Sequence, residues 1–208
     1  MLQIIPALLV AITVVIQCLA VQMSRYRLSL MNARPPHHGL ALMSGMLAAA
    51  AIILRLYQND SAVGVLFMTI MTGCMTLMTL TDAASCRLPR PFTIMYLISG
   101  SAFRLWQGDW LTGLCSAGFW FLLLLLFRQY TSYRRKTETI GLGDVFLIAG
   151  IAIWSPPGDI PWIVATAAGG ALLYLWCNRQ RRITRELPFG PFLCASQYAF
   201  TFYPGGLW

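Results

Sequence analysis

The sequence predicts an all-α protein, a polytopic membrane helix bundle of about eight spans (six to eight). Only 11% of the 208 residues are charged and 58% are hydrophobic, whereas soluble domains carry roughly 25% charged residues. Apolar runs also recur along the whole chain with short polar segments between them. Because a helix needs about 20 apolar residues to cross the hydrocarbon core, these runs are the predicted spans, and the bilayer is the natural solvent.

The runs can be followed in order along the chain. The first has no basic segment before it, so we interpret it as a retained span rather than a cleaved leader. The fourth, sixth and eighth are short, and the sixth is too short to cross the bilayer untilted. The eight predicted spans are residues 2–23, 39–56, 62–81, 92–106, 110–127, 145–154, 162–177 and 192–202.

The basic residues fall mainly on one side of the membrane if successive loops alternate. Only Arg55 and Arg104, near span ends, lie toward the other side. By the positive-inside rule the crowded side is cytoplasmic and both termini are outside. The same rule supports 145–154 as a span, because without it the basic cluster at 179–185 would lie outside. The crowded side holds 13 of the 15 basic residues: Arg25, Arg27, Arg34, Arg87, Arg90, Arg128, Arg134, Arg135, Lys136, Arg179, Arg181, Arg182 and Arg185.

The net charge of +8 therefore reflects topology and contact with lipid headgroups, and no nucleic-acid partner is expected. The six cysteines form no CxxC pair, which argues against zinc. His37 and His38 lie in a polar loop without further ligands nearby. We expect no metal site and no cofactor.

The acidic residues number only seven. Asp60, Asp109 and Asp159 lie in polar outer turns and are expected to be solvated turn residues. Asp82 and Asp144 differ, because each stands where a predicted cytoplasmic loop meets a span. Ionisable groups at membrane depth are functional candidates by default.

Each of these two aspartates also has a structural interpretation. Asp144 follows Ile-Gly-Leu-Gly and could simply be the N-cap of the next helix. Asp82 would oppose the macrodipole at a helix C-terminus, unless the helix continues into the cytoplasm. The shared side and depth favour a joint function. Two close carboxylates share one proton, so the charged one can take a proton from water while the other donates to a carbonyl.

At these positions the sequence resembles the type IV prepilin peptidases, which are intramembrane aspartyl proteases with a GxGD motif. Their pattern of an aspartate followed by an Ile/Leu-Pro pair is met by DAASCRLP, from Asp82 to Pro89. Their GxGD motif is met by Gly141 to Asp144, and their late Pro-Phe-Gly-Pro turn by residues 188–191. The resemblance covers roughly residue 62 to the C-terminus.

The resemblance implies that Asp82 and Asp144 are catalytic. It implies cleavage of prepilins or pseudopilins after a short basic leader ending in Gly, at the cytoplasmic face of the bacterial inner membrane. Gly141 and Gly143 either keep the backbone close to substrate or form a loop, and Pro89 breaks a helix or touches substrate. We expect one membrane-embedded peptidase domain over residues 1–208, with N-terminal spans and a short basic loop in 1–61 and a catalytic core in 62–208. Its oligomeric state is left open.

Two features depart from the family pattern. Many members carry a cytoplasmic domain with paired CxxC motifs after the first span and also N-methylate the new terminus. Here residues 24–38 replace that domain and contain no cysteine, so we expect methylation to be absent or weak. Phe146 stands where the family often has lysine, two residues after the second aspartate.

Two other classes of protein remain open at this stage. A small proton- or cation-coupled transporter component could use Asp82 and Asp144, but its aspartates should lie at mid-membrane on a polar path. A purely structural assembly subunit would leave both acidic positions unexplained.

Overall fold

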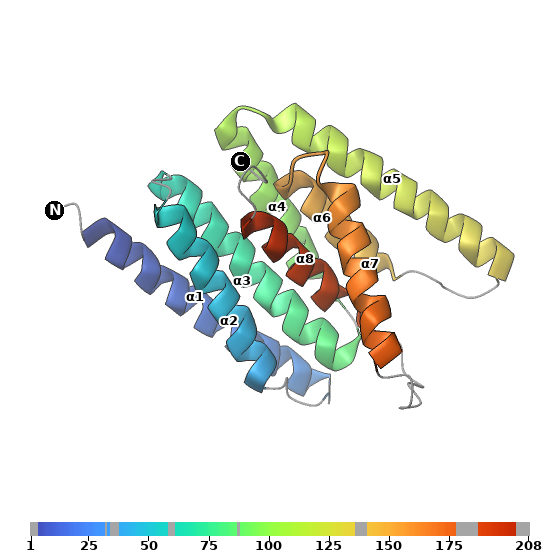
Figure 1. Cartoon of the computed structure of the whole chain (residues 1–208), viewed down its shortest axis with the longest axis horizontal. Coiled ribbons are helices and arrows are strands. Elements are labelled where there is room, and N and C mark those ends of the chain that lie inside the picture. Colours follow the sequence, from blue (N-terminus) through green and yellow to red (C-terminus); the bar gives the residue numbers. More distant parts are fainter. Residues whose placement is uncertain are drawn as a thin grey trace.

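The computed structural model describes residues 4–31, 33, 38–57, 61–86, 88–135, 141–177 and 187–202. Within these residues the chain forms eight helices and the predicted all-α bundle is confirmed (Figure 1). The helices are α1 (Ile4–Leu30), α2 (His38–Tyr57), α3 (Ala62–Ser85), α4 (Arg90–Gln107), α5 (Trp110–Arg135), α6 (Leu142–Trp154), α7 (Ile160–Cys177) and α8 (Gly190–Phe202).

Five helices of the described part are long and apolar enough to cross a membrane: α1, α2, α3, α5 and α7. By contrast, α6 has 13 residues, which at about 1.5 Å per residue is shorter than a hydrocarbon core of about 30 Å. It is apolar nonetheless, and most of its side chains are buried among α4, α5, α7 and α8. A helix too short to span the membrane can still be stable inside it when other helices, rather than lipid, surround it.

The central helix is α3, which packs against α1, α2, α4 and α8 and is buried along most of its length. Two of its buried threonines, Thr69 and Thr72, form hydrogen bonds with α1. The Thr69 hydroxyl lies 3.2 Å from that of Thr13 in α1, and the Gln17 amide donates to Thr72 at 3.2 Å. Interhelical hydrogen bonds of this kind hold helices together where the hydrophobic effect cannot.

Glycines bring α4 and α6 into close contact. A Cβ atom on Gly150 would lie 2.5 Å from the Tyr96 ring, and one on Gly100 would lie 2.7 Å from Nε1 of Trp154. The same Trp154 Nε1–H donates to the Tyr96 carbonyl at 3.1 Å. Small residues at such a crossing let the two backbones approach, and this fixes the position of α6.

The helix ends differ from the predicted runs. Both α1 and α5 continue past the apolar segment to Leu30 and Arg135, because hydropathy marks only the lipid-facing part of a helix. Asp82 lies inside the last turn of α3 rather than after it. The interpretation of Asp144 as an N-cap is wrong: Gly141 is the N-cap of α6, with φ −65° and ψ 137°, and Asp144 lies within the first turn.

Some predictions fall outside the described residues. These concern Asp60, His37, Arg34, Arg87, Lys136 and the basic cluster at 179–185. The division of the chain at residues 61 and 62 stays a prediction.

Candidate active site

Asp82 is held at the end of the central helix. It is buried, with 4% of its surface exposed. The helix stops shortly after it because Cys86 adopts a left-handed conformation (φ 51°, ψ 30°) and its N–H bonds back to the Asp82 carbonyl at 2.7 Å. Leu88 and Pro89 then lead into α4, for which Pro89 is the N-cap. The left-handed Cys86 and the N-cap Pro89 therefore fix where α3 ends and α4 begins, just after Asp82.

Asp144 is held in the first turn of α6 and is partly buried. A Cβ on Gly141 would lie 3.2 Å from the Asp144 carboxylate, and one on Gly143 would lie 2.7 Å from Cβ of Leu88. The connection that follows Asp82 thus packs directly on the turn that carries Asp144. The two predicted motif segments meet at this contact.

The structure brings the two aspartates to the same place. The segments on either side of the pair are in contact through Gly143 and Leu88, and the buried Cys194 lies in α8. Among the described residues, α3 and α6 do not contact each other through their backbones, whereas α4 and α8 each contact both. The two aspartates therefore lie at the same end of the bundle, on helices that α4 and α8 both contact.

The N-terminus of α8 completes this arrangement. The Gly190 N–H donates to Oδ2 of Asp82 at 2.9 Å, and Gly190 belongs to the Pro-Phe-Gly-Pro turn. Sequence reasoning identified that turn only by resemblance and missed both this contact and Cys194. The available signal was the turn itself, placed immediately before an apolar run.

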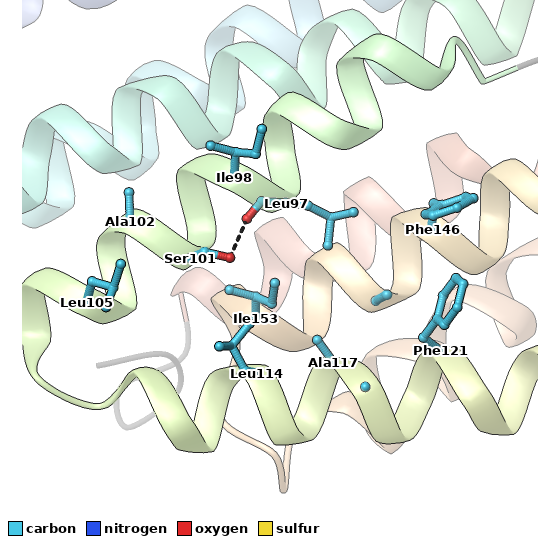
Figure 2. Close-up of a pocket in the computed structure, with 12 residues that line it drawn as sticks. Leu97, Ile98, Ser101, Ala102, Leu105, Leu114, Ala117, Phe121, Phe146 and Ile153 are labelled. Atoms are coloured by element: carbon cyan, nitrogen blue, oxygen red, sulfur yellow. Dashed lines mark hydrogen bonds between the residues drawn. The ribbon is translucent and has the colours of Figure 1, made fainter.

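A separate pocket of about 590 Å³ opens between α4, α5 and α6. Figure 2 shows its apolar lining, in which the hydroxyl of Ser101 is already bonded to the Leu97 carbonyl at 3.0 Å. Phe146 lies in its wall against Phe121, with ring centroids 5.2 Å apart. The pocket residues include no acidic side chain, so the pocket is not the place where a carboxylate pair could act.

The fold and the site together define a multi-pass membrane protein with two aspartates at one end of a helical bundle, on segments that contact each other. Such a pair can activate water and protonate a carbonyl, which is the requirement of an aspartic peptidase. A family model, the type IV leader peptidase family, matches residues 69–176. The chain belongs to this family, and the matched region contains Asp82 and Asp144.

Two curated relatives are similar to the chain. The prepilin leader peptidase/N-methyltransferase of Burkholderia pseudomallei strain 1026b is 33% identical over 175 residues, which is 79% of this chain and 53% of the relative. The protein of the same name from strain K96243 gives the same values. The chain thus spans about half the length of the curated relatives it matches. No solved structure matches it significantly.

Proposed function

We propose that the chain is an aspartic endopeptidase that removes the basic leader from type IV prepilins or pseudopilins at the cytoplasmic face of a bacterial inner membrane. One observation carries this proposal: the segment that follows Asp82 packs through Leu88 on Gly143, next to Asp144, so that two separate family motifs meet at one end of the bundle. Their place at helix ends also favours a peptidase over a transporter, whose aspartates would lie at mid-membrane.

The proposed reaction uses water, the two carboxyl groups and the peptide. The ionised carboxylate takes a proton from water as the oxygen attacks the scissile carbonyl, and the protonated carboxyl group donates its proton to the carbonyl oxygen. Collapse of the resulting diol breaks the C–N bond while the leaving amine takes up a proton. Both carboxyl groups return to their starting states.

The cytoplasmic orientation is supported by charge. The Arg27 guanidinium at the end of α1 lies over the Phe92 ring at the start of α4, 5.6 Å from its centroid. This places basic residues of α1 and α4 at the end of the bundle that holds Asp82. In Figure 1, α1, α3 and α7 run toward that same end. By the positive-inside rule that end faces the cytoplasm.

We further propose that this chain does not methylate the new N-terminus, although its relatives are named peptidase/N-methyltransferases. The support is the segment between α1 and α2, which is short and contains no cysteine. The proposal concerns this chain alone.

Co-expression with a candidate prepilin tests both proposals. We expect N-terminal sequencing of the pilin to show loss of the leader, and mass spectrometry to show an unmodified terminus. A pilin that keeps its leader, at normal abundance of both proteins, would contradict the peptidase assignment. A methylated terminus that depends on this chain would contradict the second proposal alone.

A further inference from the structure

The backbone amide of Gly190 forms a hydrogen bond with Asp82 and none with Asp144. Its N–H donates to Oδ2 of Asp82 at 2.9 Å, and both groups are buried. Within the described residues, no backbone N–H donates to the carboxylate of Asp144. The two members of the pair therefore differ in their hydrogen bonding, although each lies near a helix N-terminus.

Gly190 lacks a side chain because Asp82 occupies the space. A Cβ at this position would lie 2.7 Å from Oδ2, 3.2 Å from Cγ and 3.3 Å from Cβ of Asp82. The backbone of Gly190 is not in the left-handed region, so any residue could adopt its conformation. Position 190 therefore requires glycine because a side chain there would collide with the Asp82 carboxylate, and not because of its backbone conformation.

The helix that carries this amide is anchored on three sides. The Tyr96 hydroxyl of α4 donates to Gln197 at 2.6 Å, the Tyr198 hydroxyl donates to the Thr72 carbonyl of α3 at 3.2 Å, and Ser196 donates to the Ile163 carbonyl of α7 at 2.8 Å. All these bonds are buried. The first N–H of α8 is therefore held in a fixed position relative to α3.

A hydrogen bond to a carboxylate favours its charged form, and the positive end of a helix acts in the same direction. We propose, building on the function above, that Gly190 is a positioning residue that holds Asp82 as the ionised member of the pair. Oδ2 is occupied by the amide, so Oδ1 of Asp82 takes the proton from water and Asp144 gives its proton to the carbonyl oxygen. When the C–N bond breaks, the amine takes the proton from Asp82, and the diol returns one to Asp144.

Gly190→Ala tests the assignment, with Gly169→Ala in α7 as the matched control because a Cβ there has open space. With the full-length chain and a purified prepilin, we expect Gly190→Ala to lower kcat by about 10²-fold and to leave KM unchanged. The control keeps both values. Infrared spectroscopy gives a readout without substrate: the carboxylate band that disappears in Asp82→Asn should shift in Gly190→Ala and not in the control.

An unchanged kcat, or an unshifted Asp82 band, would overturn the proposal. If Gly190→Ala does not accumulate, the double variant Gly190→Ala, Asp82→Ala should accumulate, because the methyl group fills the vacated volume; failure of that double variant overturns the contact. If the unmodified chain cleaves no prepilin, the proposed function fails, and the infrared band alone decides whether Gly190 positions Asp82.

Discussion

At the scale of single residues, the site depends on glycines that leave room for specific neighbours. The sequence predicted that Gly143 either approaches substrate or forms a loop. In the structure, Cβ of Leu88 lies where a side chain at position 143 would begin. Leu88 follows Asp82 in the chain and Gly143 precedes Asp144, so this one contact joins the two acidic segments. A role of Gly141, Gly143 or Pro89 in substrate binding stays a prediction.

Replacing Gly143 by alanine should loosen this junction. The contact with Leu88 is between Cβ atoms, so a rotamer change cannot relieve it and the backbone must move. We expect a loss of roughly 1–3 kcal/mol, typical of overpacking, seen as a lower Tm in detergent. Gly45→Ala in α2 is the control, because its Cβ meets open space and alanine favours the helix by about 1 kcal/mol. Equal changes in Tm for both variants would show that Leu88 does not restrict position 143.

At the scale of elements, α6 is a short buried helix with a charged residue at each end. Asp144 lies in its first turn, and Arg104 from α4 reaches its last carbonyls. The Arg104 Nε–H donates to Ile153 at 2.8 Å and one terminal nitrogen donates to Ser155 at 3.0 Å. Buried carbonyls at a helix end need such partners, and a cation there complements the macrodipole. Arg104 thus fixes the helix that presents Asp144.

Removing this cap should destabilise the bundle. We expect Arg104→Gln to cost roughly 1.5–3 kcal/mol, the range for hydrogen bonds to charged groups, measured as a drop in Tm. Arg104→Lys should recover only part of the lost stability, because an ammonium group cannot donate to both carbonyls with the planar geometry of a guanidinium group. Asp109, which lies 3.3 Å from Arg104 but is 51% exposed, provides the comparison: Asp109→Asn should cost about 0–1 kcal/mol. Similar losses for Arg104→Gln and Asp109→Asn would contradict the capping role.

The sequence predicted the helices and their order, because apolar runs report burial in lipid or protein directly. It also singled out Asp82 and Asp144, because each stands where a predicted cytoplasmic loop meets a span. It could not predict the bond between Gly190 and Asp82, which joins positions 108 residues apart. Nor could it show that Arg104 turns inward, because an arginine near a span end is equally suited to the interface. Both facts depend on how helices pack.

At the scale of the whole molecule, the structure gathers the family motifs at the bundle end that the basic residues predict to be cytoplasmic. This orientation predicts that the segments around Lys136 and Arg182 face the cytoplasm. In a cysteine-free background, Thr137→Cys and Arg182→Cys should react with an impermeant reagent only after the membrane is opened. Gly158→Cys, in the turn before α7, should react in intact cells. The reverse pattern would contradict the topology and the proposed cytoplasmic site.

Cleavage of a prepilin by Asp82→Asn and Asp144→Asn variants tests the central claim most directly. Asparagine has nearly the same shape, and at position 82 it keeps an acceptor for the Gly190 amide, but it cannot carry the proton that the reaction moves. We expect each variant to accumulate normally and to lose about 10³-fold or more in rate, with the double variant no slower, because the two residues act as a unit. Asp159→Asn, in the turn before α7, should cleave normally. A variant of either aspartate that processes prepilin at a near wild-type rate would contradict the aspartyl mechanism.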